Sequence, residues 1–469
     1  MERISSGNPR LDTVLGGGLM ADSITFLFGA PGSGKTILAE QCLFANASVE
    51  RPGLYLSTAS EPFDKLLRYG QSLDFFDPAQ IGRSVFYDDL GDALTDGGLA
   101  AALDRVDDLV KQYRPGLVII DSFRALTAFA ADDAEFRRFL RDIAGRFTAL
   151  AVSSIWVGEY HADHLPDAPE FAVADAVIAL ETRRSGERST RLLSVRKLRG
   201  SDFLSGDHLY RITTGGLVVF PRLADARDVG PYPSDDGRVS TGVAALDDAL
   251  EDGYWAGSTT LIAGPSGVGK TIMGLHFLYQ GGRRDEPGIL LTLQENRHQL
   301  TRIISRFGWS IDDPRVVVLD RSPVDVYLDE LVYELLDRVE QLGARRVVVD
   351  SLGDLAASVP DISRFNELIY SLVQRCSHKG ISLMFTYEIF DLFQISRVSD
   401  VGLSHLADNV VLLQHVQYGA EVKRSLTVLK SRGSQSKRTT REFSITSSGI
   451  TLGEPIDPRS FFGPARLGL

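Results

Sequence analysis

The sequence predicts an α/β fold that occurs twice along one chain. Three observations support this prediction. A glycine-rich G-x-x-x-x-G-K-T pattern appears twice, and short apolar runs alternate with longer amphipathic stretches around each occurrence. Related segments also recur in the same order and at a nearly constant, long spacing. Such long-period self-similarity indicates two copies of one domain.

The glycine-rich pattern runs from Gly29 to Thr36 and again from Gly264 to Thr271, each time after an apolar run. Glycines let backbone N–H groups close around phosphate oxygens. In this pattern the lysine reaches the β- and γ-phosphates, and the threonine hydroxyl ligates Mg²⁺. We therefore expect ATP and Mg²⁺ at both loops. The predicted nucleotide-binding residues are Gly32, Ser33, Gly34, Lys35, Thr36, Gly267, Val268, Gly269, Lys270 and Thr271.

Composition is that of an ordinary soluble protein, with 43% apolar and 24% charged residues in 469. No apolar stretch approaches the roughly 18 residues that a membrane helix needs, and the first residues do not resemble a signal peptide. Cys42 and Cys376 lie far apart in apolar, helix-like settings, so we expect buried free thiols. We infer a reducing, cytoplasmic compartment and no membrane partner.

The net charge of −12 opposes binding to a phosphate backbone over the surface as a whole. The densest basic run of the first half, between Arg183 and Arg191, is interleaved with small polar residues. It favours a solvated hairpin tip over a nucleic-acid patch. Nucleic acid is therefore not an expected partner.

The two halves share motifs in the same order. A turn motif of the form S-[ST]-G-x-x-x-L-D ends at Asp12 and again at Asp247, with the same separation as the loop lysines Lys35 and Lys270. We predict an N-terminal domain over residues 1–224 and a C-terminal domain over 237–453, followed by a short tail over 454–469. Residues 225–236, rich in Pro, Gly and Asp, are predicted to be an exposed linker.

Near-continuous apolar strands separated by amphipathic helices indicate a parallel sheet that is covered on both faces. The expected strands of the first half are 24–28, 54–57, 117–120 and 150–156, and those of the second are 259–263, 288–293, 347–349 and 382–386. Helices are expected at 134–143 and 326–342. Hairpin-like strands close each half, at 176–182 with 192–195 and at 410–415 with 426–429. This arrangement is that of a RecA-like ATPase.

Asp121 and Asp350 end apolar strands at matching places in the two halves. A carboxylate in that place faces the loop after the first strand, so it can hold Mg²⁺ together with Thr36 or Thr271. A helix cap or turn residue is the alternative, because a serine follows each aspartate. With a phosphate loop present, the magnesium role is favoured.

Hydrolysis needs a further group that orients or deprotonates the attacking water. The second half offers Gln294 and Glu295 at the end of its second strand, and these join Lys35 and Lys270 as candidate catalytic residues. Aligning the halves places Ala59 and Ser60 opposite that pair. Glu61 comes one position late, which turns its side chain to the other face of a strand.

On these motifs the chain resembles the KaiC family of double-domain RecA-like ATPases and autokinases, with a non-clock member favoured over a true clock protein. The resemblance covers residues 3 to about 452. It implies homohexamers of two stacked rings that assemble with ATP bound between neighbours. It also implies that four cations reach the neighbour's γ-phosphate: Lys197, Arg199, Lys430 and Arg432. A solvated cationic hairpin is the alternative interpretation of these residues.

The chain also departs from the family pattern. The family has two adjacent glutamates where this chain has Ala59-Ser60 and Gln294-Glu295. We therefore expect the first half to bind ATP as a structural ligand and the second to hydrolyse it. At the family's Ser-Thr autophosphorylation pair the chain has Ser404 and His405, so Ser404 is a candidate phosphoacceptor. No clear counterpart of the clock proteins' partner-binding C-terminal segment is present.

Three functions compete. The leading one is an ATP-driven oligomeric switch that an unidentified signalling protein reads. A non-catalytic, ATP-gated scaffold is the alternative that the missing carboxylates suggest. A DNA recombinase or helicase would need basic pore loops, whereas the segments 128–135 and 356–364 contain three aspartates and no positive charge before Arg364.

Overall fold

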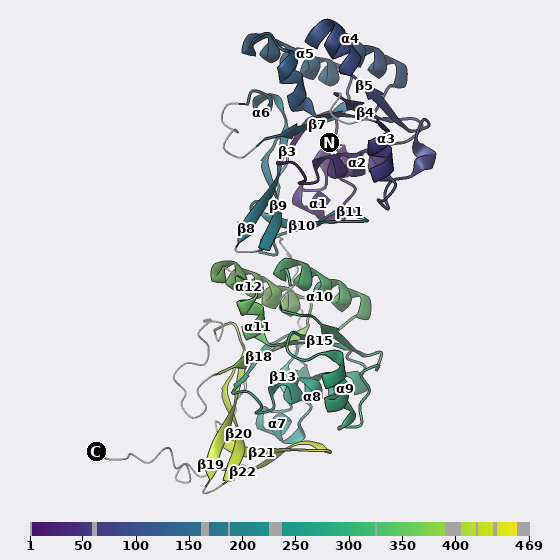
Figure 1. Cartoon of the computed structure of the whole chain (residues 1–469). Helices are drawn as coiled ribbons and strands as arrows, with labels where there is room; N and C mark the ends of the chain where they lie inside the picture. Colours follow the sequence, from purple (N-terminus) through teal and green to yellow (C-terminus); the bar gives the residue numbers. More distant parts are fainter. Residues whose placement is uncertain are drawn as a thin grey trace, which may run out of the picture. The chain divides into compact units, whose positions relative to one another are not determined.

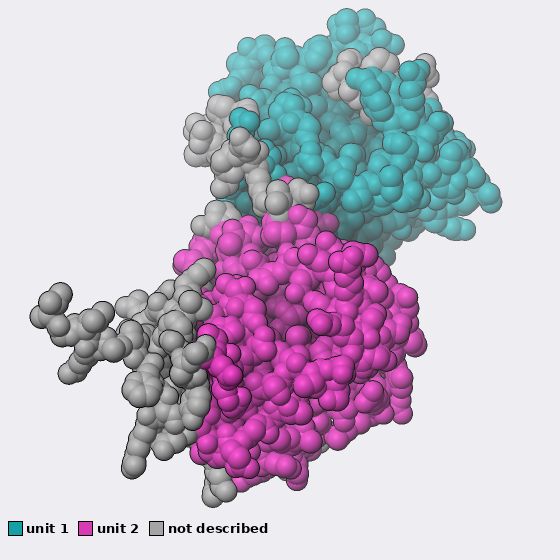
Figure 2. All heavy atoms as spheres, turned by 60° about the horizontal axis from the view of Figure 1, so that its bottom comes forward, with its two compact units in different colours: residues 1–226 teal, residues 227–469 magenta. Residues whose placement is uncertain are grey.

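The structure is a computed structural model that describes residues 2–58, 63–160, 168–185, 188–224, 237–323, 326–359, 361–389, 405–418, 421–434 and 439–456. The chain divides into two compact units, residues Met1–Ala226 and Arg227–Leu469 (Figure 2). We call them the N-terminal unit and the C-terminal unit. No helix among the described residues is long and apolar enough to cross a membrane.

Each unit contains one nine-stranded sheet. In the N-terminal unit the strand order is β11 (Gly216–Phe220), β10 (His208–Thr213), β9 (Arg188–Leu198), β8 (Ala176–Ser185), β3 (Ile24–Gly29), β7 (Ser153–Glu159), β6 (Leu117–Asp121), β4 (Gly53–Ser57), β5 (Val85–Asp89). In the C-terminal unit it is β22 (Gly449–Pro455), β21 (Thr440–Thr446), β20 (Glu421–Ser431), β19 (Asn409–Tyr418), β14 (Thr259–Gly264), β18 (Ser382–Glu388), β17 (Arg346–Asp350), β15 (Gly288–Thr292), β16 (Val316–Asp320).

The two sheets have the same topology. In both, six neighbouring strands run parallel and three further strands extend one edge as antiparallel hairpins. This arrangement confirms the predicted fold class of two tandem RecA-like domains. Short two-stranded ribbons precede each sheet, β1 (Arg3–Ile4) with β2 (Leu19–Met20) and β12 (Arg238–Val239) with β13 (Tyr254–Trp255).

Helices cover both faces of the N-terminal sheet (Figure 1). α1 (Pro9–Val14) and α2 (Lys35–Asn46) share one core with Leu27 of β3, while α4 (Gly91–Tyr113) and α5 (Asp133–Ala149) share the other with Phe26 and Phe28. Successive side chains of a strand point to opposite faces. A strand buried on both faces therefore has to be apolar throughout, which explains the continuous apolar runs in the sequence.

The C-terminal unit repeats this layering. α7 (Ala244–Ala249), α8 (Lys270–Arg283) and α9 (Arg297–Ser305) share a core with strand residues such as Ile262 and Val348. α10 (Leu328–Leu342), α11 (Leu352–Ala357) and α12 (Ile362–His378) follow β16 and β17 along the chain. The remaining short elements of the N-terminal unit are α3 (Phe63–Gly70), η1 (Pro78–Gln80), η2 (Phe123–Phe129) and α6 (Glu170–Val173).

The expected strand at 150–156 begins too early. Leu150 caps α5, its N–H donating to the carbonyl of Arg146 at 3.0 Å, and Ala151 turns the chain with a φ of 51°. β7 then begins at Ser153 and continues to Glu159. In the sequence, the apolar Leu150 continues the apolar run of the strand. In the structure this residue ends helix α5.

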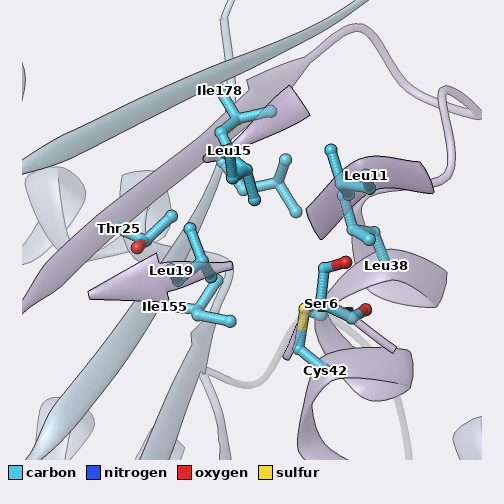
Figure 3. Close-up of a pocket in the computed structure, with 11 residues that line it drawn as sticks. Ser6, Leu11, Leu15, Leu19, Thr25, Leu38, Cys42, Ile155 and Ile178 are labelled. Atoms are coloured by element: carbon cyan, nitrogen blue, oxygen red, sulfur yellow. Dashed lines mark hydrogen bonds between the residues drawn. The ribbon is translucent and has the colours of Figure 1, made fainter. Parts of the chain in front are cut away.

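Both cysteines are buried free thiols, as the sequence predicts. Cys42 lies beside a small cavity of about 10 Å³ in the N-terminal core, among Leu11, Leu38 and Ile155 (Figure 3). Its thiol donates to the carbonyl of Ser6 at 3.3 Å, and burial raises the thiol pKa. A void of this size holds about one water at most, so it is a packing feature of the core.

One buried charge distinguishes the C-terminal core. Arg346 of β17 is fully buried and pairs with Glu286, while its Nη1 donates to the carbonyls of Ser240 at 2.8 Å and Phe277 at 2.7 Å. The guanidinium also lies 4.6 Å from the Phe277 ring centroid. Removing one partner of such a group leaves buried acceptors unsatisfied.

We predict that Arg346→Leu lowers the free energy of unfolding of the C-terminal unit by about 3 kcal/mol. The matched control is Arg345→Leu, because the neighbouring Arg345 is exposed. Urea denaturation of the full chain measures both variants. Equal midpoints for the two would contradict the structural role assigned to Arg346.

Candidate functional site

Both glycine-rich loops join the end of a central strand to the start of a helix. Gly34 and Gly269 cap α2 and α8 with φ values of 91° and 118°, a region that L side chains rarely adopt. A Cβ on either glycine would meet a hairpin side chain, Ile212 at 2.8 Å or Ile445 at 2.7 Å. Glycine is therefore required at each position for two reasons: the positive φ, and the neighbouring isoleucine that leaves no space for a Cβ atom.

The two loop lysines are almost fully buried. Lys35 Nζ donates to the carbonyls of Gly29 at 3.0 Å and Ala30 at 2.9 Å, and Lys270 Nζ donates to that of Pro265 at 2.9 Å. Desolvation lowers the pKa of both lysines. Each ammonium group is thus held inside its loop, where a phosphate group could replace a carbonyl as its partner.

The predicted metal ligands meet in both units. Thr36 Oγ1 donates to Asp121 Oδ2 at 2.7 Å, and Thr271 Oγ1 donates to Asp350 Oδ2 at the same distance. A hydroxyl and a carboxylate fit Mg²⁺, which takes few protein ligands and completes its shell with phosphate oxygens and water. Among the described residues no group of three or more His, Cys, Asp or Glu forms a separate metal site.

Two further carboxylates lie beside the lysines and were not identified from the sequence. Glu159 ends β7, and its Oε1 is 3.9 Å from Lys35 Nζ. Glu388 ends β18, and its charge opposes the desolvation of Lys270. The separation of these glutamates along the chain equals that of Asp121 and Asp350. Aligning the two halves of the sequence on Asp121 and Asp350 would therefore have paired these two glutamates.

Of the two candidate water-activating residues in the C-terminal unit, Glu295 interacts electrostatically with Asp350, the predicted metal ligand. Its Oε2 is buried with no hydrogen-bond partner among the described residues, and burial, then the charge of Asp350, raises its pKa to about 7. Gln294 instead donates to Asp354 Oδ2 at 2.8 Å. Ala59, Ser60, Glu61 and Ser404 lie outside the described residues.

The four predicted interface cations lie at the opposite end of the sheet from their own loops. Arg199 Nη1 donates to Asp175 at 3.3 Å, and Asp175 accepts from the N–H of Ile24, the first residue of β3. Lys197 donates to the carbonyls of Phe171 and Ala172 of α6. The loop begins after the last residue of β3, roughly 17 Å farther along the strand.

The C-terminal unit repeats this placement. Arg432 Nη1 donates to Asp408 at 3.3 Å, Asp408 accepts from the N–H of Thr259, and Lys430 donates to the carbonyl of Ala407 at 2.6 Å. Thr259 is the first residue of β14. Neither pair of cations is therefore placed to touch a nucleotide in the loop of its own unit.

An arginine at the start of each unit anchors the segment that follows these cations. Arg3 donates to the carbonyl of Gly18 and to Ser201 Oγ, at 2.8 and 2.7 Å. Arg238 makes the matching bonds to Gly253 and Ser434, at 3.0 and 2.8 Å. The segment that follows each cation pair is thus tied to the first strand of its unit.

A family model described as the KaiC ATPase matches residues 4–224 and again residues 239–456. The chain belongs to the KaiC family. It is 29% identical over 476 residues to the circadian clock protein KaiC3 of Synechocystis sp., covering 97% of this chain and 92% of that protein. It is 28% identical to the circadian clock oscillator protein KaiC of Rippkaea orientalis, covering 94% of this chain and 87% of that protein. The units are thus two tandem KaiC-family ATPase domains.

Within this KaiC-family chain, the N-terminal unit has a buried polar network beside Asp121, its predicted metal ligand. Tyr55 donates to Asp121 Oδ2 at 2.9 Å, and Tyr87 donates to Glu40 Oε1 at 3.2 Å. Glu40 lies on α2 one turn after Thr36 and is 3% exposed. When the units are aligned on their loop lysines, the residues of the C-terminal unit that match Glu40 and Tyr55 are apolar: Leu275 and Leu290.

The C-terminal unit has a cavity of about 270 Å³ beside its loop helix. His276 of α8 lines it together with Phe307 and Trp309, and His276 Nε2 is buried without a partner among the described residues. The matching residue of the N-terminal unit, Gln41, accepts from the N–H of Leu217. The two KaiC-type units therefore differ beside the loop helix as well as beside the metal carboxylate.

We predict that Glu40→Gln stabilises the N-terminal unit at neutral and alkaline pH. Burial raises the pKa of Glu40 to about 7. The buried carboxyl group therefore lowers the free energy of unfolding more and more as the pH rises toward 7 and its charged form becomes favoured in the unfolded chain. Relative to wild type, the free energy of unfolding of the variant should rise by up to about 3 kcal/mol at pH 8 and by much less at pH 5.

Urea denaturation of the full chain between pH 5 and pH 8 measures this difference. Glu50→Gln is the control, because Glu50 is an exposed carboxylate of the same unit. If the free energies of unfolding of Glu40→Gln and wild type differed by the same amount at every pH, the raised pKa assigned to Glu40 would be contradicted.

Proposed function

We propose that the chain is an ATP-driven oligomeric switch, a Mg²⁺-dependent ATPase that hydrolyses ATP mainly in its C-terminal unit. The observation that carries this proposal is the environment of Glu295, whose Oε2 is buried without a hydrogen-bond partner among the described residues and whose carboxyl group feels the charge of Asp350. A general base works best with a pKa near the working pH. A carboxyl group with a pKa of about 7 meets that requirement.

In this proposal each residue of the C-terminal loop has one role. Lys270 and the loop N–H groups bind the phosphates, and Thr271 and Asp350 hold Mg²⁺, which neutralises charge on the phosphate oxygens. Glu295 accepts the proton of the attacking water. Gln294 cannot accept a proton but can orient water through its amide.

The N-terminal unit binds ATP chiefly as a structural ligand. Its loop, Lys35, Thr36 and Asp121 repeat the C-terminal geometry, which supports nucleotide and Mg²⁺ binding. Ala59 and Ser60 replace the carboxylates that would activate water. Nucleotide in this unit therefore contributes to assembly more than to turnover.

The assembly is a homohexamer whose subunits share their nucleotide sites. Lys197, Arg199, Lys430 and Arg432 lie at the far end of the sheet from their own loops, so they act on the γ-phosphate of a neighbour. A cation supplied by a neighbour stabilises transition-state charge and couples hydrolysis to assembly. A signalling protein reads the nucleotide-dependent state of the ring, and Ser404 is the candidate acceptor for autophosphorylation.

The first test follows phosphate release and protein-bound label from γ-³²P-ATP in the purified full chain. Turnover should rise with pH through about 7 and level off above it, because Glu295 must be deprotonated to act. Glu295→Gln should lower turnover at least ~100-fold. Lys270→Ala should lower it roughly 10³-fold, whereas Lys35→Ala should leave most of the turnover of those subunits that assemble.

The outcomes separate the candidate functions. Label that is lost in Ser404→Ala would establish the autokinase activity. Bound ATP without either release or label in the wild type would replace the enzyme by an ATP-gated scaffold. Equal turnover in Glu295→Gln and wild type would contradict the role of Glu295.

A mixing experiment tests the shared sites. We expect Lys270→Ala and Arg432→Ala each to lose roughly 10³-fold in turnover, and a mixture of the two to regain activity. In the mixture, an intact loop on one subunit meets intact cations on another. Failure to recover activity, or an assembly size that is the same with and without ATP and Mg²⁺, would contradict sites between subunits.

A further inference from the structure

Each unit has a glutamate beside the first residue of its glycine-rich loop, and this glutamate has no role in the proposed hydrolysis. In the parallel pairing of β7 with β3, Glu159 lies opposite Gly29. In the pairing of β18 with β14, Glu388 lies opposite Gly264. The two sheets therefore place a carboxyl group at the same point of the loop edge.

The strand alternation directs both glutamates toward the loop helix. Side chains separated by an even number of residues along a strand share one face of the sheet. Val157, two residues before Glu159, belongs to the core that includes helix α2. Met384, four residues before Glu388, belongs to the core that includes helix α8. Each glutamate thus lies on the face where the loop lysine lies.

The ammonium group of the loop lysine is the partner that these carboxylates share. Glu159 Oε1 is 3.9 Å from Lys35 Nζ. Burial lowers the pKa of Lys35 and Lys270, and the charge that most opposes this shift is that of Glu159 in one unit and Glu388 in the other. Each glutamate therefore supplies counter-charge to a desolvated cation.

A bound nucleotide needs the same cation. The loop lysine reaches the β- and γ-phosphates, so phosphate oxygens compete with the glutamate for one ammonium group. The carboxylate also repels phosphate oxygens on its side of the loop, and ATP brings more negative charge there than ADP does. The glutamate therefore opposes the binding of ATP more than that of ADP.

We propose that Glu159 and Glu388 are specificity-determining residues of the two nucleotide sites, and that each competes with the γ-phosphate for the loop lysine and so reduces the preference of its site for ATP over ADP. This inference rests on the proposed binding of nucleotide at both loops, but it requires no hydrolysis.

The effect should be larger in the C-terminal unit. Water and salt weaken the interactions of exposed charges. The side chain of Glu159 is 55% exposed, whereas Glu388 is half-buried. Replacing Glu388 should therefore change the preference of its site more than replacing Glu159 does.

Equilibrium dialysis of the full chain with Mg²⁺ and either ADP or ATPγS, a slowly hydrolysed analogue of ATP, tests the proposal. Glu388→Gln is measured in a Lys35→Ala background, so that binding reports the C-terminal loop. Glu159→Gln is measured in a Lys270→Ala background, so that binding reports the N-terminal loop. Each double variant is compared with its own background, and size-exclusion chromatography establishes that the two assemble alike.

We expect Glu388→Gln to raise the ratio of ATPγS affinity to ADP affinity about threefold to tenfold, and Glu159→Gln to raise it less. The increase should shrink as the salt concentration rises to about 0.5 M, because the interaction is between charges that salt screens. Glu388→Asp keeps the charge on a shorter side chain, so its ratio should stay closer to that of the background.

The matched controls are Glu340→Gln for the C-terminal unit and Glu50→Gln for the N-terminal unit. Both residues are exposed and shortly precede a parallel strand, β17 or β4, so they lie toward the edge of the sheet opposite the loops. Neither control should change the affinity ratio.

An unchanged ratio in Glu388→Gln, or an equal change in Glu340→Gln, would overturn the proposal. A loss of ATPγS affinity in Glu388→Gln would overturn it too, because the glutamate would then assist binding of the γ-phosphate. Phosphate release from ATP is measured separately on the same proteins. The expected ratios without any phosphate release would support this inference and contradict the ATPase proposal.

Discussion

Most of the functional geometry depends on one constraint, the parallel register that brings the loop threonine within hydrogen-bond distance of the aspartate at the end of a strand two places away in the sheet. Thr36 reaches Asp121, and Thr271 reaches Asp350, only because β7 and β18 hold the two strands in parallel register. Parallel pairing places all carboxyl ends at one edge of the sheet. The loop, the metal carboxylate and the glutamate that ends β7 or β18 therefore meet at a single edge, whereas the hairpin cations are carried to the opposite one.

The two units differ in the groups that surround this shared hydrogen bond. In the N-terminal unit, Asp121 receives a second hydrogen bond from Tyr55, in a network that buries an additional carboxyl group. In the C-terminal unit, Asp350 receives it from Thr386, and the additional carboxyl group is Glu295, which follows β15. Each unit thus keeps one carboxyl group with a pKa of about 7 near its metal carboxylate. Only the second follows the strand that our proposal assigns to water activation.

The features that could be predicted are those whose residues recur at a fixed spacing along the chain. The loops, Asp121 and Asp350 follow fixed patterns and recur, so both sheets and their active edge could be inferred. Glu159 recurs too, but a single glutamate at a strand end belongs to no pattern. Glu40 could not be predicted, because a glutamate within an amphipathic helix usually faces solvent. Its burial becomes evident only when the tyrosines of two strands are packed against it.

The anchor at Arg238 has a mechanical consequence. It is the second residue described after the linker of residues 225–236, and its side chain holds Ser434, two residues beyond Arg432. A force applied to the chain just before Arg238 would therefore reach the segment after Arg432 through this hydrogen bond, and the sheet through the β12–β13 ribbon. In the proposed ring, the segment that begins the C-terminal unit is thus fastened to the part of that unit that contacts a neighbour.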